Sequence, residues 1–182
     1  MGIKIYFISG IYGVGKTTLI QTMSKTYFYE SFSASDIISN YNGENYEFNK
    51  QVINKYLNQD ILVNVVNNEL LPNVKNNILL AGHFCIISNT ASIGIEKLPM
   101  YVYENLNINK IVVLTANPHR ILQNLANRNK QAHYDEKFIS LFQDTEVKFA
   151  TTIAKKLGVD CLVHDMQYNN NDIINIRNFL ER

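Results

Sequence analysis

The sequence lacks the features that mark membrane-spanning and disulfide-rich proteins. Its two cysteines, Cys85 and Cys161, lack the spacing of metal ligands or of a disulfide framework, and both lie in apolar runs typical of buried thiols. No apolar run approaches the roughly 18 residues of a transmembrane helix. The short apolar stretch at the amino terminus leads straight into a glycine-rich loop, which does not fit a signal peptide. We therefore expect a cytoplasmic protein with no membrane partner.

The sequence also has little excess charge of either sign. Its 17 Lys and Arg residues against 16 Asp and Glu give a net charge of +1. This balance predicts no general electrostatic attraction to nucleic acid or to anionic membranes. No linker, internal repeat or low-complexity tail interrupts the 182 residues, of which 46% are hydrophobic. Length and composition therefore predict a single compact domain over residues 1–182.

The most informative stretch is residues 10–18, Gly-Ile-Tyr-Gly-Val-Gly-Lys-Thr-Thr. It fits the phosphate-binding loop, or Walker A motif, Gly-x-x-x-x-Gly-Lys-[Ser/Thr]. Glycines let successive backbone N–H groups turn towards an anion, the lysine brings a positive charge to the β- and γ-phosphates, and the threonine hydroxyl reaches Mg²⁺. We predict ATP and Mg²⁺ as cofactors, with Thr17 as the metal ligand. The predicted cofactor-binding residues are Gly10, Tyr12, Gly13, Val14, Gly15, Lys16, Thr17, Thr18 and Arg128.

Strand-like and helix-like segments alternate along the chain. Strand patterns cover 3–9, 27–33, 77–82, 110–115 and 159–164. Helical spacing covers 15–26, 48–71, 98–106, 118–127, 136–157 and 172–180, and a further helix opens at 34–36. This alternation predicts an α/β fold whose parallel sheet is covered on both faces, with the ligand at the carboxyl ends of the strands.

Two polar residues follow predicted strands and would lie near the loop. Asp36 follows the strand at 27–33, on the side where an acceptor substrate would bind, and its carboxylate could orient or deprotonate an attacking hydroxyl. The alternative role for Asp36 is a helix cap without chemistry. His83 follows the strand at 77–82, where it would bind phosphate or substrate or anchor its own loop. We predict Asp36 and His83 as substrate-binding residues, and Lys16, Asp36 and Arg128 as catalytic residues.

Magnesium ligands are sparse in the sequence. Many phosphate-loop enzymes carry an aspartate at the end of the third strand, where this chain has Ala81. Either Asp36 or Asp165 would then help to bind Mg²⁺, or Thr17 and water molecules would supply most of its ligands.

Arginine is scarce too, with only four in the chain. Arg120 and Arg128 lie eight residues apart on one predicted helix and can face the same way. Arg128 begins the polar segment Arg-Asn-Lys, and together with Lys130 it forms a predicted lid at about 128–136. The lid would bring cations to the transferring phosphoryl group and exclude water. An arginine plane there would also stack on the base. The alternative is a solvated turn between helices.

The chain resembles the P-loop nucleoside monophosphate kinases, in particular the archaeal-type adenylate kinases. The likeness rests on the loop at 10–18, on 93–113, which is similar to their Gly-Leu-Pro segment with its following helix and strand, and on Arg128-Asn-Lys130, where they carry Arg-x-Arg. It implies a three-layer P-loop NTPase fold, a five-stranded parallel sheet in the order 2-3-1-4-5, and ATP·Mg²⁺ as phosphoryl donor. Ala81, and Lys130 in place of an arginine, depart from the pattern.

These observations predict a kinase that transfers the γ-phosphoryl group of ATP to a nucleoside monophosphate, with a small-molecule nucleotide rather than nucleic acid as its partner. A close alternative is a small-metabolite kinase with a hydroxyl acceptor and Asp36 as base. A second alternative is a nucleotide-binding regulatory protein or slow NTPase without kinase activity, which Ala81 and the few arginines favour. The sequence makes no prediction of the oligomeric state.

Overall fold

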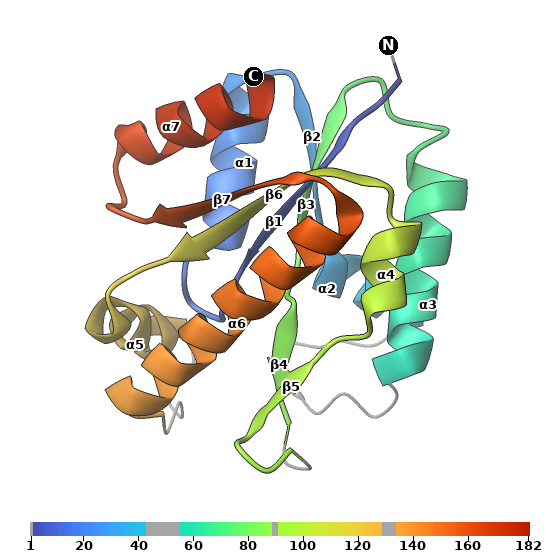
Figure 1. Ribbon diagram of the computed structural model, residues 1–182. Coiled ribbons are helices and arrows are strands. Elements are labelled where there is room, and N and C mark those ends of the chain that lie inside the picture. The colour runs from blue at the N-terminus through green and yellow to red at the C-terminus, as the bar shows by residue number, and fades with distance from the viewer. Residues whose placement is uncertain (1, 43–54, 89–90, 129–133) are drawn as a thin grey trace.

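The computed structural model of the chain describes residues 2–42, 55–88, 91–128 and 134–182 (Figure 1). Five parallel strands form its main sheet in the order β2-β3-β1-β6-β7. Their bounds are β1 (Ile5–Gly10), β2 (Tyr29–Ser33), β3 (Asn77–Ala81), β6 (Ile108–Thr115) and β7 (Asp160–Asp165). When only these five strands are counted along the chain, the order is 2-3-1-4-5. The predicted fold class and strand order are therefore confirmed.

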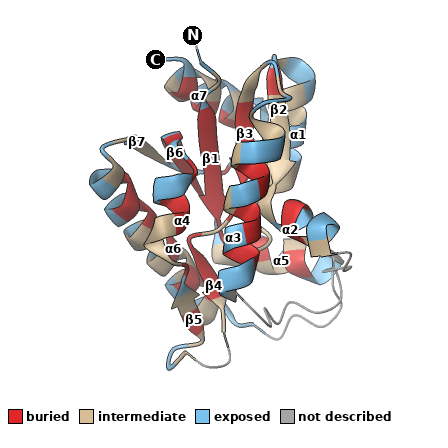
Figure 2. Ribbon diagram, turned by 90° about the vertical axis from the view of Figure 1, so that its right-hand side faces the viewer, coloured by how far each residue is buried: buried red, intermediate tan, exposed pale blue. Residues whose placement is uncertain are grey.

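The middle of the sheet is the core of the molecule. All six residues of β1 are buried, as are four of the five residues of β3 (Figure 2). Both strands are apolar runs without alternation, which is typical of parallel strands covered on both faces. The phosphate-loop segment leaves β1 at the carboxyl edge, so it begins from the most constrained part of the sheet.

Helices cover both faces of the sheet. They are α1 (Lys16–Thr26), α2 (Ala34–Asn42), α3 (Lys55–Val65), α4 (Met100–Asn105), α5 (Pro118–Arg128), α6 (Glu136–Leu157) and α7 (Asn170–Glu181). The helices α3, α4 and α6 lie over one face and α1 and α7 over the other (Figure 1). On that second face the guanidinium of Arg177 in α7 lies 4.2 Å from the ring centroid of Tyr27, which follows α1.

Two details differ from the sequence expectation. The long helix expected at 48–71 is helical over its described part, but its last turn is a π-helix, Val66–Leu70; residues 48–54 lie outside the described chain. A β-hairpin, β4 (Cys85–Ile87) paired with β5 (Ile95–Lys97), was not predicted. It extends beyond the carboxyl edge of the main sheet, at the bottom of Figure 1.

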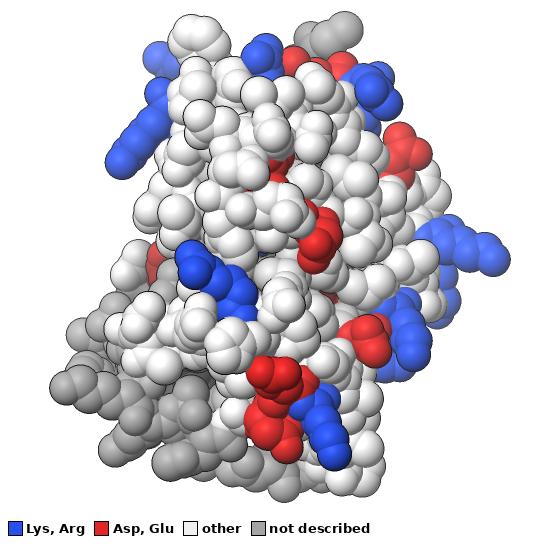
Figure 3. Space-filling view, turned by 90° about the vertical axis from the view of Figure 1, so that its left-hand side faces the viewer, with Lys and Arg blue, Asp and Glu red and all other residues white. Residues whose placement is uncertain are grey.

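The described chain contains no helix with the length and apolar character needed to cross a bilayer. On the face formed by α5, β7 and α7, acidic and basic side chains lie interspersed among uncharged ones (Figure 3).

Candidate nucleotide-binding site

The loop between β1 and α1 has a backbone that requires glycine. Gly10 has a φ of 142°, and a Cβ atom on it would lie 2.6 Å from the main-chain oxygen of Leu114. Gly15, the residue before α1, has a φ of 103° in the left-handed region, which L side chains rarely adopt. The loop geometry therefore needs both glycines that the motif fixes, and it also needs Gly13, which has a φ of 81°.

Lys16, the first residue of α1, folds back over this loop. Its Nζ donates hydrogen bonds to the main-chain oxygens of Gly10 at 2.6 Å and Ile11 at 3.0 Å. The carbonyl groups of the loop therefore hold the ammonium group in place, where it can bind a phosphate that occupies the loop.

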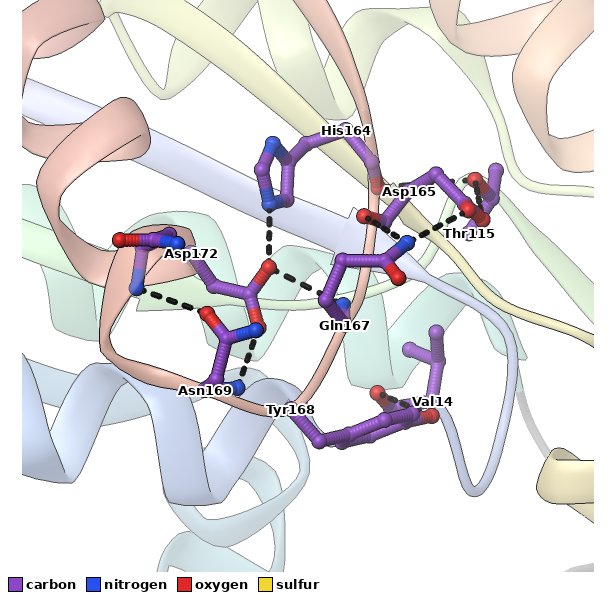
Figure 4. Close-up of polar contacts among 9 residues, drawn as sticks. Val14, Thr115, His164, Asp165, Gln167, Tyr168, Asn169 and Asp172 are labelled. Atoms are coloured by element: carbon purple, nitrogen blue, oxygen red, sulfur yellow. Dashed lines mark hydrogen bonds and ion pairs between the residues drawn. The ribbon is translucent and has the colours of Figure 1, made fainter.

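Two further carbonyls of the loop are held by residues distant in sequence. Asn124 of α5 donates its Nδ2 to the Gly13 oxygen at 2.9 Å. Tyr168, in the turn after β7, donates its hydroxyl to the Val14 oxygen at 3.4 Å (Figure 4). Together with the Lys16 contacts, side chains hydrogen-bond to the carbonyls of four loop residues, Gly10, Ile11, Gly13 and Val14, which fixes the orientation of the peptide groups between them.

Several backbone N–H groups of the same loop, unlike these carbonyls, have no hydrogen-bond partner in the described chain. Those of Gly13, Gly15 and Thr17 donate to no acceptor among the described residues. Unsatisfied N–H groups in a glycine-rich turn at the start of a helix form an anion-binding concavity, and the positive end of the helix dipole adds to it. The arrangement is suited to bind the phosphates of a nucleotide.

A buried carboxylate supports the loop from behind. Glu146, in the middle of α6, is fully buried and accepts hydrogen bonds from the backbone N–H groups of Phe84 at 2.9 Å, Cys85 at 2.6 Å and Gly10 at 3.3 Å. Burial raises the pKa of the Glu146 carboxyl above its usual value, although these three N–H donors and the charge of Lys16 act in the opposite direction. No motif in the sequence predicted a role for this residue.

Asp36 lies in the first turn of α2, which follows β2 directly. Ser33 at the end of β2 is paired with Ala81 of β3, and Ala81 with Ile8 of β1. Because neighbouring strands are about 4.8 Å apart, the end of β2 lies about 10 Å across the sheet edge from the end of β1. The Asp36 carboxylate is exposed and has no hydrogen-bond or ion-pair partner among the described residues, so it is not acting as a helix cap.

His83 packs against the phosphate loop. Its ring centroid lies 4.5 Å from that of Tyr12, and its main-chain oxygen accepts a hydrogen bond from the Tyr103 hydroxyl at 2.7 Å. Burial raises the pKa of Tyr12, so its phenol stays neutral. The ring contact joins the segment after β3 to the phosphate loop, and the hydrogen bond joins it to α4. The substrate-binding role of His83 stays a prediction.

Oxygen ligands for a metal are few among the described residues, which contain no group of three or more His, Cys, Asp or Glu side chains arranged to hold an ion. Asp165 is engaged, since its oxygens accept hydrogen bonds from Thr115 Oγ1 at 3.2 Å and Gln167 Nε2 at 3.0 Å (Figure 4). Thr17 places a hydroxyl at the loop. Mg²⁺ keeps several water molecules and binds largely through substrate phosphates, so this donor set fits a metal that arrives with its nucleotide.

The arginines of α5 fall at opposite ends of the helix. The Arg120 guanidinium lies 5.2 Å from the ring centroid of Tyr168, beside the loop. Arg128 ends α5, but its side chain and residues 129–133, which include Lys130, lie outside the described part of the chain. The predicted lid and its cations therefore remain predictions.

The turn that carries Tyr168 is held by one carboxylate. Asp172, which is 2% exposed, accepts hydrogen bonds from His164 Nε2 at 2.8 Å and from the N–H groups of Asn169 at 3.0 Å and Gln167 at 3.1 Å (Figure 4). Burial alone would raise the pKa of Asp172, but these donors outweigh it and lower the pKa. Within this turn Tyr168 takes a positive φ of 57°, which places its ring beside Gly15.

Comparisons with known proteins agree with this layout. A family model described as AAA domain matches residues 9–140. The fold is similar to shikimate kinase from Bacteroides thetaiotaomicron, with a TM-score of 0.64, 16% identity, and 98% of this chain and 99% of that chain covered. It is also similar to shikimate kinase from Acinetobacter baumannii in complex with shikimate, with a TM-score of 0.59, 12% identity, and 98% and 92% of the two chains covered.

A search of curated proteins found no significant match. At these low identities the solved structures show a shared fold, and they add no support for a closer likeness to the archaeal-type adenylate kinases. The matched family model covers more than half of the chain, including the loop, the segment after β3 and α5. The chain belongs to the AAA domain family.

Proposed function

We propose that this protein is an ATP-dependent kinase that transfers the γ-phosphoryl group to a hydroxyl group of a small metabolite. The observation that carries the proposal is the exposed Asp36 carboxylate, which has no described partner and lies two strands from the phosphate loop. A carboxylate in that position is suited to accept the proton of an attacking hydroxyl. The shared fold of two shikimate kinases, which act on a small metabolite, gives further support.

The donor side would be bound by the loop. The N–H groups of Gly13, Gly15 and Thr17 would hold the phosphates, and Lys16 would exchange its contacts with Gly10 and Ile11 for phosphate oxygens. Mg²⁺, bound with Thr17, would neutralise charge on the β- and γ-phosphates. The side chains of Arg120 and Tyr168, which lie beside the loop, would stack on the adenine base.

The transfer step needs one proton acceptor. The acceptor oxygen forms a bond to the γ-phosphorus as the bond from that phosphorus to the β–γ bridging oxygen breaks, and ADP leaves with the bridging oxygen. Asp36 takes the proton of the acceptor hydroxyl. Positioning and charge neutralisation supply most of the acceleration in reactions of this class.

From the described residues on the acceptor side we infer an acceptor without an anionic group. The described segments that follow β2 and β3, residues 34–42 and 82–87, contain no lysine or arginine. A nucleoside monophosphate or a carboxylate substrate is normally bound through such cations. We therefore propose a neutral hydroxyl compound, such as a sugar, polyol or nucleoside, in preference to a nucleoside monophosphate or to shikimate.

A coupled ADP-release assay with Mg²⁺·ATP tests this proposal. The panel should contain neutral sugars, polyols and nucleosides, the nucleoside monophosphates, and shikimate. We expect stimulation by a neutral hydroxyl compound. Stimulation by nucleoside monophosphates alone would make the protein a nucleotide kinase, and slow hydrolysis unaffected by any acceptor would make it an NTPase; either result overturns the proposal.

A further inference from the structure

Helix α6 carries two polar side chains on the side that faces the sheet, one turn apart. The first, Gln143, pairs with the backbone of Ala116, which follows β6: its Oε1 accepts from the Ala116 N–H at 2.8 Å and its Nε2 donates to the Ala116 oxygen at 3.0 Å. The second is Glu146. Through these two residues α6 is hydrogen-bonded to the carboxyl end of β1 and to the segments that follow β6 and β3, the two neighbours of β1 in the sheet.

Glu146 makes the connection between the two sides of the site. Its Oε1 accepts from Gly10, where β1 passes into the phosphate loop, and from Phe84, two residues beyond Gly82; its Oε2 accepts from Cys85. In the described chain, the last backbone hydrogen bond between β1 and β3 towards their carboxyl ends runs from the Gly82 N–H to the Ile8 oxygen. The carboxylate thus continues the connection between the strands where their ladder stops.

A carboxylate is a costly choice for this position. The other buried residues of α6 are apolar, among them Phe142 and Ala150 on either side of Glu146. A buried charge destabilises the fold unless its hydrogen bonds are satisfied, and an apolar side chain of similar size would generally pack there at no such cost. Glu146 accepts hydrogen bonds from three backbone N–H groups. Its role is therefore to fix the position of the backbone rather than to fill the core.

We propose that Glu146 is a positioning residue for phosphoryl transfer, which fixes the phosphate loop relative to the segment after β3 on the acceptor side. This inference rests on the proposed kinase function. Transfer requires the donor phosphorus and the acceptor oxygen to be aligned, and a misplacement of about 1 Å costs about a hundredfold in rate. Loosening the link between Gly10 and Phe84 would therefore reduce turnover.

The affinity for ATP, unlike turnover, should not fall when Glu146 is replaced. Glu146 places a negative charge behind the loop that binds phosphates, close enough to Lys16 for the two charges to interact. The substitution Glu146→Gln keeps the size of the side chain and removes that charge, so the loop loses no attraction for ATP. Its amide nitrogen, however, must face one of the backbone N–H groups that a carboxylate oxygen accepts, so one of the hydrogen bonds is lost.

The test compares Glu146→Gln with Asp144→Asn, which changes an exposed acid of the same helix. With turnover counted per ATP-binding site, we expect Glu146→Gln to lower kcat at least about tenfold while the KM for ATP stays within about twofold. Asp144→Asn should match the wild type. A merely structural role would reduce the number of binding sites and leave kcat per site unchanged, and that result overturns the proposal.

A second readout does not depend on finding the acceptor. In Glu146→Gln, amide hydrogen exchange should accelerate at least about tenfold at one or more of Gly10, Phe84 and Cys85, with Mg²⁺·ATP still bound. Wild-type exchange at all three amides overturns the inference even if the kinase function holds. Conversely, faster exchange in a protein that no acceptor stimulates would leave Glu146 as the tie between the strands and contradict only the kinase function.

If Glu146→Gln does not fold, an NMR pH titration of the wild-type protein tests the proposal instead. One carboxylate accepts all three hydrogen bonds, so its protonation must shift the amide signals of Gly10, Phe84 and Cys85 with one common midpoint. Among the described residues, Glu146 interacts electrostatically with Lys16, Tyr12, Cys85 and Tyr103, and burial raises the pKa values of the last three, which keeps them neutral through this titration. Three unrelated midpoints would contradict the proposed tie.

Discussion

The ammonium group of Lys16 lies 2.6 Å from the main-chain oxygen of Gly10, the residue with which the phosphate loop begins. A second bond to Ile11 holds the same side chain over the loop. The lysine is thus placed at the phosphate site before any ligand arrives. Binding requires only that it exchange two carbonyl partners for phosphate oxygens, which form stronger, charge-assisted hydrogen bonds.

We therefore predict that Lys16→Ala lowers ATP-dependent turnover about a hundredfold, because the developing charge on the phosphates loses its nearest cation. Steady-state kinetics and ATP titration of the purified variant measure this. Lys25→Ala, an exposed lysine in the last turn of the same helix, is the matched control and should behave as the wild type. Unchanged ATP affinity and turnover in Lys16→Ala would contradict the assignment of the loop.

Asp36→Asn separates chemistry from stability. We expect acceptor-dependent turnover to fall about a hundredfold, in line with the usual contribution of a general base. The melting temperature should move by less than about 2 °C, because the side chain is exposed and has no described partner. Asp160→Asn, at the opposite end of the sheet, is the control. A large loss of melting temperature with little loss of turnover would show that Asp36 is structural.

Tyr168 is predicted to contribute to nucleotide affinity through its ring. We expect Tyr168→Ala to weaken ATP binding about five- to tenfold, because it removes the aromatic face beside Arg120 and the loop. Tyr168→Phe keeps the ring and loses two long hydrogen bonds of 3.4 Å, the one it donates to Val14 and the one it accepts from Asn124, so it should bind within about twofold of the wild type. Calorimetric titration with Mg²⁺·ATP measures both; equal losses in the two variants would assign the effect to the hydroxyl instead.

The turn after β7 should be sensitive to acid through Asp172. Its pKa is lowered below the ordinary value of 3.8, so the folded state favours the carboxylate more than the unfolded state does. The resulting stabilisation is present above the unfolded pKa and is lost as the pH falls through the lower folded one. We predict that Asp172→Asn costs about 1–3 kcal/mol of unfolding free energy at pH 7. The difference from the wild type should shrink on acidification.

Chemical denaturation of both proteins at neutral pH and below about pH 4 checks this prediction. A difference that stays constant over that range would mean that packing, and not the charge, accounts for the effect of Asp172→Asn. Asp160→Asn, which changes an exposed acid at the start of β7, is the control and should have the unfolding free energy of the wild type.

The architecture was predictable because the sequence marks it in several consistent ways. The run over Ile5–Gly10 has the continuous apolar character of a central parallel strand, and the glycine-rich motif behind it fixes the strand–loop–helix order. The hairpin of Cys85–Ile87 and Ile95–Lys97 was not predictable in this way. Its strands are three residues long, too short for a period to emerge, and its pairing is fixed by tertiary context.

The supporting residues of the site were harder to predict than the loop. Glu146 reads as an ordinary helix residue, and its only sequence signal is its place in the buried stripe of α6 with Ile139, Phe142, Ala150 and Ile153. Tyr168 and Asn124 meet the loop from segments more than 100 residues away, and no local pattern relates them to it. The loop could be identified from its motif, but what holds it in place depends on the fold.

We propose that this phosphate loop serves phosphoryl transfer to a neutral hydroxyl compound. The most direct test incubates the wild-type protein with Mg²⁺ and ATP labelled in its γ-phosphoryl group, in the presence of a neutral, phosphate-free metabolite pool. We predict that the label appears in an acid-stable phosphate monoester, and that its appearance depends on both Lys16 and Asp36. Label that appears only as inorganic phosphate, at a rate that the pool does not change, would contradict it.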